Sequence, residues 1–218
     1  MATALLLGAT GLVGSQLLPR LLDDPRYSQV IAFGRRLPPA GHPKLLPIVG
    51  ELADLAHHAA SLQADDLYCC LGTTIKQART REAFQAVDLE APLAAARAQE
   101  RPQDKRYFLV SALGADPRSR IFYSRVKGEL ETTLAGLGFR TLGIVRPSLL
   151  LGKRAQPRAG EVAAEVLMAL LSPLLLGPLQ RYRAIEASEV ADGLLHLSKG
   201  LATEACLQSC VFHSGGMA

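Results

Sequence analysis

The chain has 218 residues, of which 49% are apolar, and its 24 Lys and Arg against 20 Asp and Glu leave a formal net charge of +4. This length predicts one domain over residues 1–218 rather than two, and so small a positive excess does not indicate a nucleic-acid partner. Four cysteines, two of them adjacent at Cys69 and Cys70, do not make a disulfide framework. We therefore expect a reducing compartment, with the cytoplasm as the default location.

Short apolar runs that alternate with helix-length segments dominate the chain. Nearly continuous apolar runs are typical of strands covered on both faces, and alternation of strands with helices predicts a parallel sheet. We therefore predict an α/β fold, a Rossmann-type doubly wound parallel sheet. The predicted strands are residues 3–7, 30–33, 45–49, 67–71, 107–110 and 142–145, and helical patterns cover about 79–100, 121–137 and 190–198.

The first helix follows the first strand and carries one apolar stripe. Val13, Leu17 and Leu21 recur at helical spacing, which predicts a face that packs on the sheet. Pro19 lies inside this pattern and should kink or shorten the helix, because proline lacks the backbone donor.

Residues 152–178 are less regular and are interrupted by prolines. We expect them to form a small C-terminal excursion over the strand ends, with residues 152–180 as a lid on the substrate side. Their apolar run 166–176 fits core, a subunit interface or this lid, so a homo-oligomer stays open. The longest apolar run, 166–179, is shorter than the roughly 20 residues of a membrane span, and we expect none.

Three glycines follow the first strand directly and open the first helix. Gly8 permits a tight turn, Gly11 lets the backbone approach a pyrophosphate, and Gly14 lets the helix close on the strand. The helix N-terminus then supplies free N–H groups and positive dipole for the phosphates. A glycine-rich turn without a ligand is the alternative, but the position after an apolar strand favours a dinucleotide site.

The end of the second strand indicates which dinucleotide binds. An NAD-selective site places an acidic residue there, about 20 residues past the loop, to bind the ribose 2′-hydroxyl. This chain instead has Arg35 and Arg36, whose guanidinium groups suit a 2′-phosphate. A solvated arginine pair is the alternative. We predict that NADP(H) is preferred over NAD(H).

The segment 121–137 contains a candidate catalytic pair. Tyr123 and Lys127 lie one helical turn apart on one face. A phenol with a pKa of about 10 is a poor acid at neutral pH, but a neighbouring ammonium favours its ionised form. Ser111, directly after the fifth strand, offers a hydroxyl at the same sheet edge that can polarise a carbonyl, although it could simply cap the strand.

No other residues form a persuasive site. His57 and His58 point to different sides of a helix and have no third ligand at useful spacing, so we expect no metal. The arginines and lysines are scattered without interleaved aromatic residues, so we expect no nucleic acid.

Taken in order, the glycine loop, Ser111 and the Tyr123–Lys127 pair resemble the short-chain dehydrogenase/reductase family. The match is closer to its small atypical branch, the Tat-interacting-protein-like NAD(P)-binding proteins, over about residues 3–198. The segments that carry this resemblance are GRRL at 34–37, CCLGTT at 69–74, YSRVKGELE at 123–131 and RP at 146–147.

The resemblance implies a complete site. Tyr123 would be the proton donor and acceptor, Lys127 would bind the nicotinamide ribose and lower the tyrosine pKa, and Ser111 would orient the substrate carbonyl. The implied cofactor-binding set adds the pyrophosphate loop, the 2′-phosphate pair, residues on the adenosine side and residues at the nicotinamide end. These are Gly8, Thr10, Gly11, Leu12, Val13, Gly14, Arg35, Arg36, Leu71, Gly72, Leu150 and Arg158.

One residue departs from the family pattern. Where many relatives place an asparagine that holds a relay water, this chain has Asp88. The leading hypothesis is an NADPH-dependent oxidoreductase, of carbonyl reductase or alcohol dehydrogenase type, acting on an unidentified small carbonyl or alcohol. Asp88 motivates the alternative, an NADPH-binding regulatory or scaffold protein with little or no catalysis.

Overall fold

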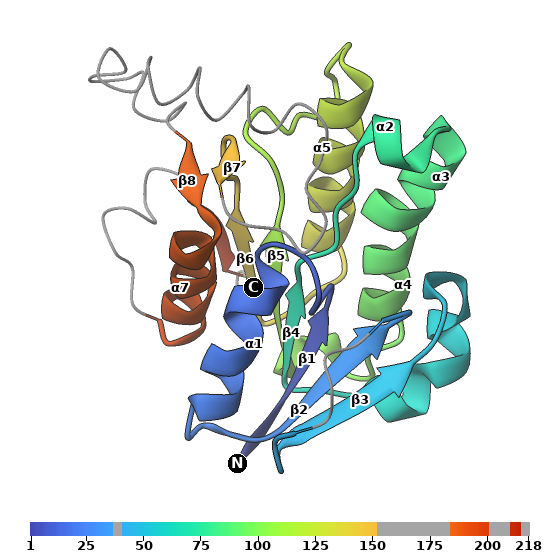
Figure 1. The fold of residues 1–218 in the computed structure, drawn as a ribbon. Coiled ribbons are helices and arrows are strands. Elements are labelled where there is room, and N and C mark those ends of the chain that lie inside the picture. Colours follow the sequence, from blue (N-terminus) through green and yellow to red (C-terminus); the bar gives the residue numbers. More distant parts are fainter. Residues whose placement is uncertain (37–40, 152–183, 201–209, 215–218) are drawn as a thin grey trace.

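The computed structural model describes residues 1–36, 41–151, 184–200 and 210–214. Seven strands of these residues form one sheet in the order β3-β2-β1-β4-β5-β6-β9, and the first six in this order are parallel (Figure 1). The order 3-2-1-4-5-6 is that of the doubly wound dinucleotide-binding fold, so the predicted fold class is confirmed. The sequence patterns did not reveal β9, which runs antiparallel to β6.

The predicted strands all form, with small changes at their ends. The fourth strand stops at Cys69, two residues earlier than expected, and the second begins at Tyr27, three residues earlier. The strands of the sheet are β1 Ala2–Leu7, β2 Tyr27–Gly34, β3 Leu45–Val49, β4 Asp66–Cys69, β5 Arg106–Val110, β6 Thr141–Val145 and β9 Cys210–Ser214, and the short strands β7 Leu150–Leu151 and β8 Ile185–Glu186 pair beside it.

Two apolar layers cover the sheet because successive strand residues point to opposite faces. Ala4 and Leu6 of β1 pack on one face, beneath α1 Gly14–Asp23 and α7 Ala187–Ser198. Leu5 and Leu7 pack on the other face, with α4 Ala91–Arg97, α5 Phe122–Ala135 and the 3-10 helix η1 Leu52–Leu62. Figure 1 shows α1 and α7 on one side of the sheet and α4 and α5 on the other.

Helix α1 runs through Pro19 to Asp23, so the proline does not shorten it. Proline removes the backbone bond to the carbonyl four residues earlier, which belongs to Ser15. Pro19 and Ser15 are both exposed, so water can satisfy that carbonyl while Leu17 and Leu21 stay buried on the other face.

The helical segment expected over residues 79–100 is divided into short pieces. Helices α2 Ile75–Ala78 and α3 Arg81–Gln85 come first, and a π-helical turn, η2 Ala86–Glu90, then joins α3 to α4. Such π turns frequently occur at functional sites. This one contains Asp88, which is completely buried.

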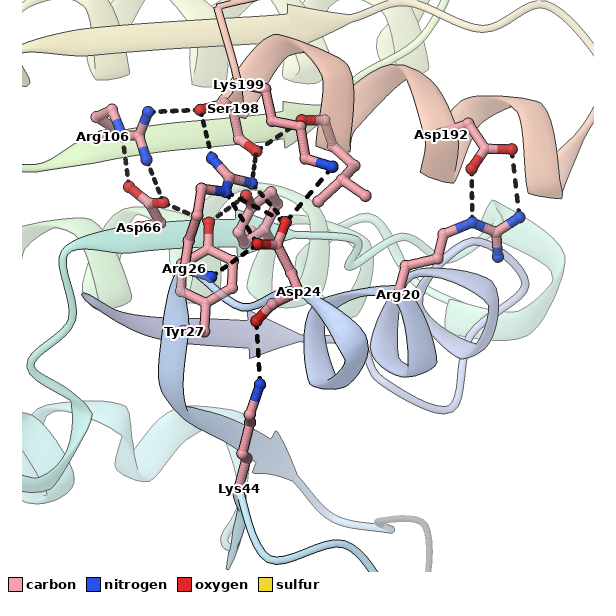
Figure 2. A network of polar contacts seen from close by, with 12 residues as sticks. Arg20, Asp24, Arg26, Tyr27, Lys44, Asp66, Arg106, Asp192, Ser198 and Lys199 are labelled. Atoms are coloured by element: carbon pink, nitrogen blue, oxygen red, sulfur yellow. Dashed lines mark hydrogen bonds and ion pairs between the residues drawn. The ribbon is translucent and has the colours of Figure 1, made fainter. Parts of the chain in front are cut away.

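A polar network ties the end of α7 to the amino ends of the strands (Figure 2). Buried Asp66 accepts hydrogen bonds from Arg106 Nε at 2.6 Å and from the hydroxyl of Tyr27. Arg106 and Arg26 also donate to the carbonyl of Ser198, at 2.6 and 2.8 Å. Cations at a helix C-terminus donate hydrogen bonds to its free carbonyls and interact favourably with the negative end of the helix dipole. The network therefore fixes α7 against the sheet at the edge opposite the glycine loop.

The tyrosines of this network remain protonated. Burial, together with the charge of Asp66, raises the pKa of Tyr68 to about 12. Burial also raises the pKa of Tyr27 above its ordinary range, and the two hydroxyls lie 2.8 Å apart. Both side chains therefore serve as neutral hydrogen-bonding groups.

No helix among the described residues is long and apolar enough to cross a membrane. Three sequence-based expectations lie outside the described residues: the lid at 152–180, the apolar run 166–176 within it, and Arg158.

Candidate active site

The carboxyl ends of the parallel strands meet along one row of the sheet. Register places residues at or next to the last position of neighbouring strands side by side, in the order Phe33, Leu7, Cys69, Leu109 and Ile144. The glycine loop, Arg35, Leu71 and Ser111 each follow a strand of this row by one or two residues, whereas Tyr123 and Lys127 lie on α5, the helix after β5. The topology therefore brings segments far apart in sequence to the same edge, where ligands bind in open α/β sheets.

The glycine loop has no room for a side chain at Gly8 or at Gly14. Gly8 has a φ of +81°, and a Cβ there would lie 2.7 Å from the carbonyl oxygen of Cys70. A Cβ on Gly14 would lie 2.1 Å from the carbonyl oxygen of Gly8. Both distances are shorter than real contacts allow, so glycine lets α1 begin directly against β1 and β4.

This loop presents backbone donors at the start of α1. Among the described residues, the N–H groups of Leu12 and Val13 have no hydrogen-bond partner, and the first turn carries no acidic residue. The Val13 side chain packs in the core, whereas Thr10 is exposed. Leu12 and Val13 would therefore contribute main-chain groups to an anion, as helix N-termini do.

We expect substitution of Gly14 with Ala to weaken NADPH binding at least tenfold, or about 1.4 kcal/mol, because the loop must move to relieve the clash with Gly8. Titration of NADPH fluorescence measures the loss. The control is Gly41→Ala, since a Cβ on Gly41 meets nothing within 4 Å. Equal affinities for the two variants would refute the proposed role of the loop.

Arg35 and Arg36 continue directly from the end of β2. Because Phe33 pairs with Leu7, Arg35 lies about one residue beyond the level of Gly8 on the neighbouring strand. Both arginines are exposed, and Arg35 Nε lies 3.9 Å from a carboxylate oxygen of Glu51. An exposed ion pair at this distance contributes little to stability, so Arg35 can exchange Glu51 for an anion of higher charge.

The segment after β4 connects the glycine loop to the tyrosine helix. A Cβ on Gly8 would lie 3.1 Å from the Leu71 nitrogen, and a Cβ on Gly72 would lie 3.8 Å from Asp88 Oδ1. The next N–H, that of Thr73, donates to Asp88 Oδ2 at 2.8 Å. Asp88 in turn contacts Lys127, whose Nζ lies 2.8 Å from Oδ1.

Lys127 is almost completely buried, with 3% of its side chain exposed. Burial disfavours the ammonium, but the charges of Asp88 and Tyr123 outweigh burial and raise the pKa of Lys127. The lysine is therefore a charged group at neutral pH. Tyr123 lies one turn earlier on the same helix, α5, and the two groups interact electrostatically.

Tyr123 is half-buried on the first turn of α5. Its ring lies 5.7 Å from that of Phe84 on α3, which also packs 5.6 Å from Phe122. This aromatic cluster fixes the helix start, while the phenol remains partly accessible.

Ser111 is held next to the end of β6. Its N–H donates to the carbonyl of Val145 at 2.8 Å, and that of Leu113 donates to Pro147 at 2.9 Å. The Ser111 hydroxyl is buried and has no hydrogen-bond partner among the described residues. A buried hydroxyl without a partner is costly, and a substrate oxygen would satisfy it.

The contact between the loop after β5 and α5 was not predicted from the sequence. It depends on Gly128, because a Cβ there would lie 2.2 Å from the Pro117 nitrogen and would push the loop away. The N–H of Asp116 also donates to the carbonyl of Ser124 at 3.0 Å. The detectable signal was a glycine inside a helix, which usually has a packing reason.

A further ion pair braces the same helix. Buried Glu131 accepts two hydrogen bonds from Arg146 Nε, at 3.0 and 3.1 Å, just beyond β6. Burial opposes the charge of Arg146, but the stronger effect is its hydrogen bonds to Glu131, which raise its pKa. Leu150 lies farther along in β7 and packs against the core beneath α1 and α7.

The residues present fit a dinucleotide. The glycine loop leaves room that side chains would fill, and free N–H groups lie at a helix start without acids. The buried hydroxyl of Ser111, just after β5, has no hydrogen-bond partner among the described residues. Among the described residues there is no group of three His, Cys, Asp or Glu side chains able to hold a metal.

The chain has relatives of comparable length. It is 34% identical over 173 residues to protein fmp52, mitochondrial, of Emericella nidulans, which covers 75% of this chain and 73% of that protein. It is also 34% identical over 160 residues to protein HTATIP2 of Rattus norvegicus, which covers 72% of this chain and 66% of that protein. No family model matches the chain.

Solved structures share the fold. The Bordetella bronchiseptica enzyme WbmH, in complex with NAD+, has a TM-score of 0.66 at 15% identity and covers 93% of this chain and 73% of that one. An oxidoreductase of the short-chain dehydrogenase/reductase family from Burkholderia thailandensis has a TM-score of 0.62 at 22% identity, covering 93% and 86%.

The cytoplasmic location expected from the sequence is wrong on this evidence. Several of the fungal relatives are named as mitochondrial proteins. The error arose because a low cysteine content argues only for a reducing environment and does not distinguish one such compartment from another.

Proposed function

Because the chain belongs to the family of the fmp52 and HTATIP2 proteins, an atypical NAD(P)-binding branch of the short-chain dehydrogenase/reductases, we propose that it is an NADP(H)-dependent oxidoreductase. Its substrate would be a small carbonyl compound or alcohol, and its site of action would be mitochondrial, as in the named relatives. The observation that carries this proposal is the buried, charged Lys127 one turn from Tyr123, at the edge where the glycine loop opens.

In this proposal the cofactor is bound by the main chain and by cations. Residues from Gly8 to Gly14 hold the pyrophosphate, and Arg35 and Arg36 hold the 2′-phosphate. Leu71 and Gly72 would line the adenosine side and Leu150 would contact the nicotinamide end. Arg158, which lies outside the described residues, would reach back to the cofactor. When bound, the reduced nicotinamide supplies a hydride to the carbonyl carbon.

The protein's own groups act on the oxygen of the substrate. The Ser111 hydroxyl donates a hydrogen bond that polarises the carbonyl, and the Tyr123 hydroxyl gives its proton to the developing alkoxide. The phenolate left on Tyr123 is stabilised by the ammonium of Lys127 and regains a proton from solvent. In the reverse direction, the same phenolate accepts the proton of the alcohol.

The preference for NADP(H) is tested by Arg35→Ala/Arg36→Ala. We expect NADPH affinity to fall at least tenfold, about 1.4 kcal/mol, while NADH affinity is unchanged, because only NADPH carries the 2′-phosphate. Fluorescence titration with both cofactors measures this. Arg140→Ala, an exposed arginine just before β6 at the other sheet edge, is the control. An equal loss for NADH would remove the assignment.

A second function, an NADPH-binding regulatory or scaffold protein, is favoured by one observation. The Asp88 carboxylate lies 2.8 Å from Lys127 Nζ and counters its charge directly, at the position where many relatives have an asparagine. This alternative predicts tight NADPH binding and no oxidation of NADPH by a broad panel of aldehydes, ketones and quinones. Turnover of any panel member that depends on Tyr123 would exclude it.

A further inference from the structure

Asp88 and Lys127 form an ion pair that lies almost wholly out of water. The aspartate side chain is completely buried, 3% of the lysine side chain is exposed, and the two charged atoms lie 2.8 Å apart. An isolated buried charge is expensive, and such groups lose their charge unless they are paired. The Asp88 carboxylate therefore stabilises the charged form of Lys127.

The carboxylate of Asp88 makes two contacts, one with each of its oxygens. Oδ1 contacts Lys127 on α5, and Oδ2 accepts the N–H of Thr73 in the segment after β4. The π-helical turn at 86–90 carries the aspartate between these two elements. Its position thus couples a catalytic helix to a segment proposed to line the cofactor.

Few other groups set the charge of Lys127. Tyr123 faces it from the same helix, and Cys69 faces it from β4. Burial raises the pKa of the Cys69 thiol, so that group stays neutral at physiological pH. Among these neighbours, Asp88 alone supplies a full negative charge while Tyr123 is protonated.

We propose that Asp88 is a positioning residue: its carboxylate holds the Lys127 ammonium in place and charged, and ties it through Thr73 to the cofactor-side loop. This role rests on the proposed oxidoreductase function of Tyr123 and Lys127. Many relatives have an asparagine at this position that holds a relay water. In this chain a direct contact between a carboxylate and the lysine takes its place. The ammonium needs no such water to remain charged.

The first test measures Lys127 itself and needs no substrate. In Asp88→Asn the amide oxygen can still accept from Thr73, so its NH₂ group faces the ammonium. We expect the pKa of Lys127 to fall by at least about two units, because burial is no longer opposed by a charge. NMR titration of carbon-13-labelled lysine measures it, with the signal assigned by its loss in Lys127→Met.

The matched control is Asp192→Asn, which also removes one negative charge but from a half-exposed pair with Arg20 on α1. The pKa of Lys127 should not change in it. An unchanged pKa in Asp88→Asn would overturn the proposal.

If Asp88→Asn does not fold, stability measurements still decide. Asp88→Leu leaves a buried ammonium without its counter-ion, whereas Asp88→Leu/Lys127→Met removes both charges. We expect the double variant to be more stable than Asp88→Leu: it should fold where Asp88→Leu does not, or unfold at a higher urea concentration. A double variant no more stable than Asp88→Leu would contradict the proposal.

Kinetics separate this inference from the proposed function. For any carbonyl substrate that is turned over, Asp88→Asn should move the alkaline limb of the kcat profile to lower pH, because the Tyr123–Lys127 pair loses its first proton sooner. A purely structural defect would lower the profile without moving it. If Lys127 titrates as expected but no carbonyl is reduced, the proposed function fails and the charge-holding contact remains.

Discussion

Replacing Tyr123 with Phe is expected to lower kcat for carbonyl reduction by about 10²–10⁴-fold, the usual contribution of a positioned proton donor. The change removes only the hydroxyl. The ring that packs 5.7 Å from Phe84 is kept, so the fold and the start of α5 should be preserved. NADPH affinity should stay at the wild-type value, because the main-chain loop and the arginines remain. Steady-state kinetics with a fluorescence titration measure both quantities.

Tyr107→Phe is the matched control for this experiment. It removes a buried hydroxyl that donates to the Pro92 carbonyl at 3.2 Å; Tyr107 lies near the amino end of β5, away from the carboxyl ends of the strands. It should cost about 1 kcal/mol of stability and leave turnover unchanged. Retained turnover in Tyr123→Phe, or equal losses in the two variants, would show that Tyr123 is not the proton donor.

Replacing Asp66 with Ala is expected to lower the free energy of unfolding by about 3–5 kcal/mol. The substitution removes the carboxylate that pairs with the mostly buried Arg106 guanidinium and accepts from the Tyr27 hydroxyl, and it leaves only their weaker neutral partners, the Ser198 carbonyl and the Tyr68 hydroxyl. Figure 2 shows both side chains pointing to this carboxylate from β5 and β2. Urea unfolding measures the loss. NADPH binding by the folded fraction should be retained, because the network lies at the amino ends of the strands.

Asp192→Ala provides the comparison, since it breaks an aspartate–arginine pair of similar geometry at the surface. Arg20 Nε lies 2.6 Å from Asp192, but the two side chains are 27% and 49% exposed. Water can replace each partner there, so the expected loss is less than about 1 kcal/mol. A comparable loss in both variants would show that burial does not determine the strength of these contacts.

Much of the fold was predictable because it depends on local pattern. The apolar run at 3–7 forms a buried strand whichever helices cover it, since both of its faces require apolar side chains. The glycine spacing after it was equally informative, because only glycine tolerates the φ of +81° at Gly8 and the close approach of its neighbours. Tyr123 and Lys127 share a face through helical geometry alone.

Other features depended on contacts between distant segments. The helical pattern at 79–100 did not predict the π turn, and it did not show that Asp88 in this turn contacts a lysine 39 residues later in the chain. The strand β9 and the network around Asp66 arise in the same way. Their partners are separated by long stretches of sequence, and no local pattern records the pairing.

The sequence by itself determined the class of fold, the glycine loop and the candidate catalytic pair, because each depends on residue type at short spacing. Only the tertiary structure decided how these parts meet. Strand register aligned the carboxyl ends in one row, and Gly128 allowed the loop after β5 to lie on α5. Folding also brought Asp88, which in the sequence is only a departure from the family motif, to 2.8 Å from Lys127. Two charges removed from water together are stable only when they are paired.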